Sequence, residues 1–105
     1  MRLAIAILIA SAIPAYAYQD ITKAAVELGS VLGSETACAF KVNDAAVAAY
    51  IKTNVDPAEM HFANSLYMMS GGTAGQISLM TPSALAAHCM AIKASAGHYG
   101  LIEMQ

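Results

Sequence analysis

Residues 81–100, TPSALAAHCMAIKASAGHYG, decide the fold that the sequence predicts. Thr81 followed by Pro82 is a typical helix start, because threonine caps free backbone amides and proline suits the first helical position. Gly100 provides a stop, since glycine adopts the left-handed conformation that ends many helices. We therefore predict a helix over residues 82–99. Apolar residues at helical spacing predict that its inward face contains Leu85, Cys89, Ile92 and Ala96.

Two further helices are predicted in the first half of the chain. Asp20 is a suitable cap for a helix over residues 20–33, and Asn43 or Asp44 for a helix over residues 44–55. The inward faces are predicted to contain Ile21, Ala24, Leu28, Val31 and Leu32 in the first helix, and Val47, Tyr50 and Ile51 in the second. Residues 34–42 are predicted to form an irregular joint that holds Cys38.

A further helix is predicted between residue 55 and the helix over residues 82–99. Its predicted start is the motif Asp56-Pro57-Ala58-Glu59. An aspartate cap, a proline and a glutamate three residues after the cap resemble a capping box. Gly71 and Gly72 are predicted to end this helix. Residues 73–80 are ambiguous, either a loop or a short helical turn that packs Ile77, Leu79 and Met80. The buried face of the helix is predicted to contain Met60, Ala63, Leu66, Tyr67 and Met69.

The predicted fold class is therefore all-α, a small four-helix domain with one disulfide. The sequence has no alternating strand run of useful length and no internal repeat. Gly29 and Gly33 weaken the first helix as an isolated segment. We expect these glycines to allow the close approach of a neighbouring helix.

The N-terminal stretch, residues 1–17, has the layout of a secretory signal peptide. Arg2 supplies a positive charge, an apolar run follows, and residues 15–17, AYA, provide the small-x-small pattern that signal peptidase reads. The apolar run is shorter than the roughly 20 residues that a membrane-spanning helix needs. We predict cleavage after Ala17, a single mature domain over residues 18–105, and no stable membrane insertion after the leader is removed.

The charge of the mature chain disfavours nucleic acid as a partner. Loss of Arg2 with the leader leaves four basic residues against seven acidic ones, a net charge of −3 with neutral histidines. A surface that follows phosphates needs clustered lysine and arginine side chains. A nucleic-acid partner is therefore not expected, whereas a protein partner or a homodimer stays open.

The two cysteines, Cys38 and Cys89, are predicted to form a disulfide. An exported chain reaches an oxidising compartment, where an even number of cysteines favours pairing. The chain-entropy treatment of so long a loop gives a stabilisation of about 4 kcal/mol. A catalytic or redox thiol is disfavoured, because Cys89 lies on an apolar face and no Cys-x-x-Cys motif is present.

Histidine and methionine side chains raise the alternative of a metal site. His98 follows His88 by ten residues, about 15 Å along a helix, which is too far for one shared ion. Thioether and imidazole groups suit Cu(I), but no Met/His pair has the i, i+3 or i+4 spacing of helical ligands. We interpret the methionines as core filler, with no metal site and no cofactor. A copper-binding protein is the alternative, and the residues concerned are Met60, His61, Met68, Met69, Met80, His88 and Met90.

No catalytic group of residues can be recognised. The glycine-rich segment SGGTAGQ, residues 70–76, lacks the lysine and the preceding strand of a phosphate-binding loop. Asp56 and Glu59 are already assigned to a helix start. No local motif links a base to Ser30, Ser65 or Ser83. No catalytic residue is predicted, and the chain is not expected to be an enzyme.

Parts of the sequence resemble known proteins. Cys38, the Thr81-Pro82 helix start and Cys89 resemble in layout the periplasmic acid-stress chaperones of enteric bacteria (the HdeA type), which are small, all-helical and carry one disulfide. This resemblance implies a stress-related binding activity. Three segments are similar to small exported alphaproteobacterial proteins of uncharacterised function, which implies export but no activity. The segments are AAVELGSVLGSETAC (24–38), HFANSLYMMSGG (61–72) and AHCMAIKASAGHYGLI (87–102).

The sequence therefore predicts a small periplasmic or secreted helical protein without catalytic activity. Its function is expected to be binding, or a stress-related role.

Overall fold

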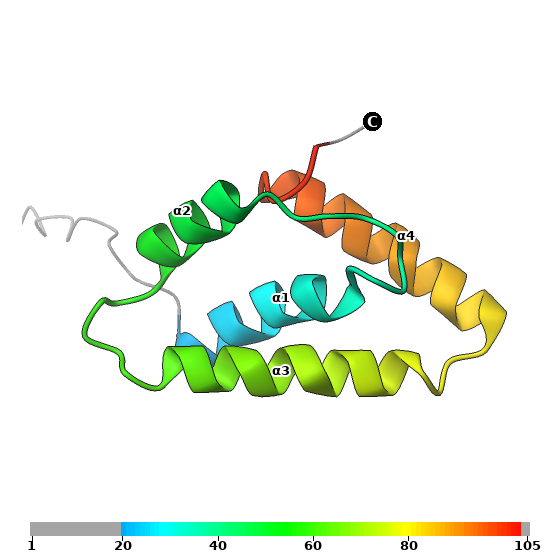
Figure 1. Cartoon of the computed structure of the whole chain (residues 1–105), viewed down its shortest axis with the longest axis horizontal. Helices are drawn as coiled ribbons and strands as arrows, with labels where there is room; N and C mark the ends of the chain where they lie inside the picture. The colour runs from blue at the N-terminus through cyan, green and yellow to red at the C-terminus, as the bar shows by residue number, and fades with distance from the viewer. Residues whose placement is uncertain (1–19, 104–105) are drawn as a thin grey trace, which may run out of the picture.

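The computed structural model describes residues 20–103, and this part of the chain is helical (Figure 1). The helices are α1 (Ile21–Ser34), α2 (Asp44–Asn54), α3 (Phe62–Ile77) and α4 (Pro82–His98). No strand occurs within residues 20–103, and a disulfide joins Cys38 to Cys89. The prediction of an all-α fold with four helices and one disulfide is confirmed for these residues. The predicted leader over residues 1–17 lies outside them.

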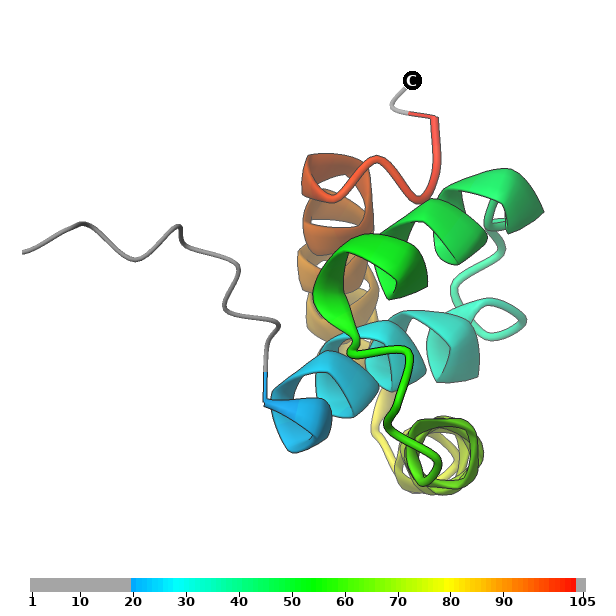
Figure 2. The same cartoon turned by 90° about the vertical axis from the view of Figure 1, so that its left-hand side faces the viewer.

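Helix α1 occupies the centre of the fold. Helix α3 runs along one side of α1, and α2 and α4 lie on the opposite side (Figures 1 and 2). The most extensive contact between helices is that of α1 with α3, followed by that of α1 with α4. The buried core consists of Ala24, Ala25, Leu28, Val31, Val42, Tyr50, Val55, Phe62, Ala96 and Leu101.

Side-chain caps start three of the helices as the sequence predicts. The side chains of Asp20 and Asn43 accept hydrogen bonds from the amides of Thr22 and Ala46 at the starts of α1 and α2. Thr81 accepts from the Ala84 amide at 3.2 Å, with Pro82 in the first helical position of α4. These caps satisfy backbone amides that have no partner inside the helix.

The predicted start of α3 at Asp56 is wrong. Residues 56–59 form a turn, closed by a hydrogen bond from the Glu59 amide to the Asp56 carbonyl at 2.9 Å. The two carboxylates accept from the amides of Ala58 and His61, so they stabilise the turn instead of a helix. The physical reason is that Val55 and Phe62 on either side are both buried, and the chain has to turn between them.

The predicted end of α3 at Gly71 and Gly72 is also wrong. Both glycines lie inside α3, and neither has the positive φ that would stop the helix. The helix continues to Ile77, so the segment left ambiguous by the sequence belongs mainly to α3. Packing against α1 explains this, because tertiary contacts routinely outweigh the low helix propensity of glycine. Gly100, with φ of 71°, does follow α4 as predicted.

The face of α3 that packs inward differs from the predicted one. Phe62 and Ile77 are buried and Leu66 is half-buried, whereas Met60 and Tyr67 are exposed. Gly29 and Gly33 decide this orientation. A Cβ atom built on Gly29 would lie 2.7 Å from Met69 Cβ, and one on Gly33 would clash with the backbone carbonyl of Ser70. The expected close approach at the two α1 glycines is therefore confirmed, and it fixes the face of α3 that meets α1.

Candidate binding surface on helix α3

The disulfide attaches the middle of α4 to the turn that follows α1. The sulfur atoms of Cys38 and Cys89 are 2.01 Å apart, and the Cα atoms 5.2 Å. Cys38 is buried and Cys89 half-buried. Of the predicted inward residues of α4, Ala96 is buried, while Leu85 and Ile92 are half-buried. Both cysteines are therefore used as a structural cross-link, and neither presents a thiol for chemistry.

A serine–histidine contact that the sequence did not reveal lies next to this cross-link. Ser34 Oγ is 2.8 Å from His88 Nε2, and Ser34 is fully buried. The same hydroxyl donates to the Ser30 carbonyl at 2.6 Å. Since a hydroxyl has one proton, His88 Nε2–H is the donor to Ser34. A nucleophilic serine would need the reverse arrangement, with an unprotonated Nε2 that accepts the hydroxyl proton. The pair therefore serves to link α1 with α4.

The interpretation of the methionines as core filler is wrong for most of them. Met60, Met68 and Met90 expose 88, 64 and 76 % of their surface, and Met69 also stays partly open. For Met68 the reason lies in the rotation of α3, because the α1 glycines contact the Met69–Ser70 backbone and turn the Tyr67–Met68 side outward. Within residues 20–103, no group of three histidine, cysteine, aspartate or glutamate side chains is placed to hold a metal ion.

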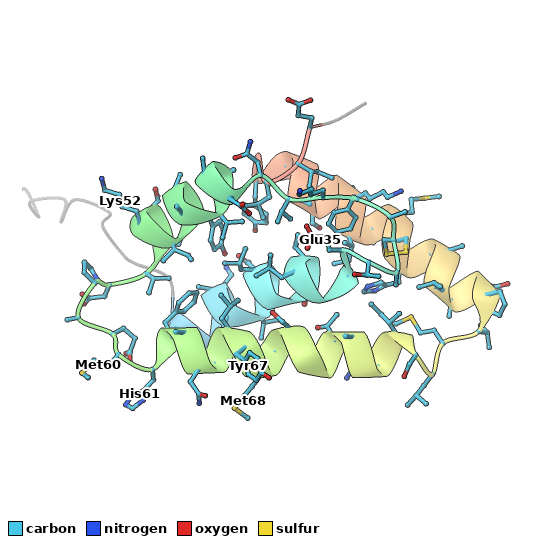
Figure 3. The ribbon with its side chains drawn as sticks, in the orientation of Figure 1. Glu35, Lys52, Met60, His61, Tyr67 and Met68 are labelled. Atoms are coloured by element: carbon cyan, nitrogen blue, oxygen red, sulfur yellow. A yellow bond between two sulfur atoms is a disulfide. The ribbon has the colours of Figure 1, made fainter. Side chains whose placement is uncertain are left out.

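One side of α3 forms an exposed surface without formal charge, which we call the outer face. Figure 3 shows Met60, His61 and Met68 pointing away from the rest of the fold. Tyr67 and Leu79 expose 80 and 86 % of their surface. From residue 60 to residue 92 the sequence contains no Asp, Glu, Lys or Arg. The outer face consists of Asn64, Tyr67, Met68, Gly71, Gly72 and Gly75 of α3, together with Met60 and Leu79 in the turns just before and after the helix, all exposed.

The glycines of the outer face have no role inside the fold. A Cβ atom at Gly71, Gly72 or Gly75 would meet nothing within 4 Å. Each glycine nevertheless costs a helix about 1 kcal/mol relative to alanine. The contrast with Gly29 and Gly33 is direct, because these two are needed for the contact of α1 with α3. Packing within the fold therefore explains why glycine occupies positions 29 and 33 of α1. It gives no reason for glycine at positions 71, 72 and 75 of α3.

Two shallow grooves border the helices. One, of about 700 Å³, runs beside the outer face between α3 and the end of α1, with Gly33, Tyr67 and Gly71 among its lining residues. The other, of about 690 Å³, lies beside the C-terminal segment, where Lys41, Lys93 and Glu103 line it together with Phe40 and Ile102. The first groove extends the uncharged surface of α3 onto α1.

The charged side chains lie on the other elements, and two of the glutamates, Glu27 and Glu35, have structural partners there. Glu35 accepts from the Val42 amide at 2.8 Å and holds the joint between α1 and α2 (Figure 3). Glu27 accepts from the Tyr50 hydroxyl at 2.8 Å, and the Tyr50 ring meets the Tyr99 ring edge-on at 5.7 Å. This cluster connects α1, α2 and the end of α4.

The Tyr99 hydroxyl should ionise at higher pH than an ordinary tyrosine. Desolvation of its hydroxyl, the Glu27 charge and a hydrogen bond to Glu27 raise the pKa of Tyr99 above 10.0. The folded state then holds the proton more tightly than the unfolded state. The stabilisation from this group is complete below pH 10.0 and is lost as the pH rises through the folded pKa.

An alkaline absorbance titration checks this expectation. Comparison with Tyr99→Phe identifies the ionisation step that belongs to Tyr99, and Glu27→Gln should move that step to lower pH. A Tyr99 step that stays in place in Glu27→Gln would contradict the role of Glu27.

Comparison of the chain with known protein families, with curated proteins and with solved structures finds no match. Within residues 20–103, none of the helices combines the length and the apolar character needed to span a membrane.

Proposed function

We propose that this chain is a small exported binding protein without catalytic activity, and that it acts through a protein contact on the outer face of α3. The observation that carries the proposal is a helix face that exposes Tyr67 and Met68 and has no charged residue along its length. A contiguous patch of exposed apolar side chains is typical of a protein-binding site. Tyrosine and methionine are also enriched in protein interfaces.

The other features support this proposal over an enzymatic role. The disulfide is suited to an oxidising compartment, in keeping with the secretory leader that the sequence predicts. The Ser34 hydroxyl is buried and already donates its proton to a backbone carbonyl. A stress-related role, as the resemblance to acid-stress chaperones implies, would use the same face to hold apolar segments of unfolding proteins.

Suppression of aggregation tests the binding role. We expect the oxidised protein to slow the aggregation of insulin chains that have been reduced and then freed of reductant, because the aggregating chains expose apolar segments that fit the outer face. Met68→Lys should abolish most of this effect, since a charge on the face has to be desolvated on binding. The matched control is Met90→Lys, which places the same charge on an exposed methionine of α4. Equal protection by the two variants, or no protection by the parent protein, would overturn the proposal.

A copper-binding protein is the second candidate, and the exposure of the thioethers favours it. Met68 Sδ lies 3.8 Å from Asn64 Nδ2, so the thioether leans toward the end of α3 that carries Met60 and His61. Thioether and imidazole groups suit Cu(I). Native mass spectrometry of protein isolated from the periplasm should then show bound copper, which Met60→Leu and Met68→Leu would remove. Protein that carries no copper after exposure to Cu(I) would eliminate this candidate.

A further inference from the structure

The outer face of α3 is arranged symmetrically about the Met69–Ser70 peptide bond. Each residue before this bond can be paired with the residue that lies the same number of positions after it. Within α3, these pairs on the outer face join a larger side chain to a glycine. Met68 corresponds to Gly71, Tyr67 to Gly72 and Asn64 to Gly75. In the turns just beyond the two ends of α3, Met60 corresponds to Leu79, and both are almost fully exposed.

This pattern fits a two-fold contact between antiparallel helices. In such an interface the same patch is used by both partners, so each residue meets the residue at the mirrored position of the other copy. In such a contact, Met68 and Tyr67 of one copy would lie over Gly71 and Gly72 of the second copy. The same side chains of the second copy would lie over the glycines of the first. Exposed apolar side chains would then face the open space above the glycines, where nothing lies within 4 Å.

From this arrangement we infer that a second copy of the chain covers the outer face, with the two α3 helices antiparallel. The inference rests on the proposed function, because it names the partner for the same surface. Another protein can bind to this surface only when the two copies separate. The fold already contains a helix contact of this kind. Gly29 and Gly33, four residues apart, let α1 approach the α3 backbone, and Gly71 and Gly75 repeat that spacing on the opposite side of α3.

The size and charge of the face fit a second copy. An aromatic side chain such as Tyr67 presents about 150–250 Å² when open to water. With the somewhat smaller Met60, Met68 and Leu79, which are also largely exposed, the four side chains expose on the order of 600 Å². This area approaches the roughly 800 Å² that each partner buries in a standard interface. Two copies of a face without Asp, Glu, Lys or Arg bring no like charges together, and antiparallel helices oppose their dipoles favourably. Membrane-surface helices instead carry lysine or arginine on their polar side, which α3 lacks.

Glycine substitutions on the outer face separate dimerisation from folding. In the isolated chain, Gly72→Ala meets open space and improves helix propensity, so the melting temperature measured at high dilution should rise. In the dimer the added methyl group lies under Tyr67 of the second copy and should weaken association at least about tenfold in sedimentation equilibrium. The control Met90→Lys should associate like the parent protein. Gly72→Ala that associates as tightly as the parent would overturn the inference.

Photo-crosslinking tests the antiparallel register. With benzoylphenylalanine in place of Tyr67, the oxidised protein should give a covalent dimer cross-linked close to Gly72 of the second copy. Cross-links near position 67 of the second copy would indicate parallel helices, and cross-links on another element would indicate a different interface; each result overturns the inference.

The outcome is separable from that of the proposed function. A chain that stays monomeric at every concentration, yet loses insulin protection in Met68→Lys but not in Met90→Lys, would overturn only the dimer. A dimer with the antiparallel cross-link and no protection of insulin would overturn only the binding of other proteins.

Discussion

Replacement of both cysteines, Cys38→Ser together with Cys89→Ser, should lower the free energy of unfolding by about 4 kcal/mol. The cross-link joins residues 51 positions apart in the sequence, so its loss greatly enlarges the set of unfolded conformations. Small domains have a total stability toward the lower end of about 5–15 kcal/mol. We therefore expect the variant to be close to its unfolding threshold at room temperature.

Helix α4 should respond most strongly to loss of the disulfide. Its buried contribution to the core is limited to Ala96, and the contact between α4 and α1 is much smaller than that between α3 and α1. Hydrogen exchange should therefore show faster exchange of α4 amides than of α1 amides in the cysteine variant. The contact between Ser34 and His88 then remains as a polar link between α4 and α1.

Urea titration of the oxidised parent, the reduced parent and the double-serine variant measures the effect. The reduced parent and the variant should agree, and a reducing agent should leave the variant unchanged. A difference below about 1 kcal/mol between the oxidised and reduced parent would contradict the expected stabilisation.

Gly33→Ala should destabilise the fold by about 1–3 kcal/mol. The new Cβ atom would lie 2.8 Å from Thr73 Cβ and would also meet the backbone carbonyl of Ser70. A backbone group cannot move aside as the end of a flexible side chain can. Helices α1 and α3 would have to separate along the largest contact in the fold.

The matched control for this prediction is Gly71→Ala, which makes the same chemical change on an open helix surface. It should stabilise the monomer by about 0.5–1 kcal/mol, because alanine restricts the unfolded chain and favours the helix. Urea titrations at a concentration where the chain is monomeric compare the two variants. Effects of the same sign in Gly33→Ala and Gly71→Ala would show that the α1–α3 approach is not as close as the structure indicates.

Helix starts with capping side chains were predictable from the sequence. Asp20, Asn43 and Thr81 each act on an amide two or three residues away, so the information needed is local. The motif at Asp56 shows where local reasoning fails. The same capping side chains satisfy a turn equally well, and the burial of Val55 and Phe62 selects the turn.

The candidate surface was not predictable, because it depends on how α3 is rotated. Methionines and Tyr67 at helical spacing indicate a core face when the helix is considered alone. The structure turns them outward, since Gly29 and Gly33 place the Met69–Ser70 side of α3 against α1. The contact between Ser34 and His88 was missed for the same reason, as it joins residues of two helices far apart in the sequence.

The sequence by itself determined the helical fold class, the capped starts of α1, α2 and α4, and the pairing of Cys38 with Cys89, the only pairing that two cysteines allow within one chain. Tertiary structure alone decided the bounds of α3, its inward face and the surface it presents to solvent. The physical reason is the range of the interactions. Caps act within one turn of a helix, whereas the rotation of α3 follows from backbone contact with glycines on another helix.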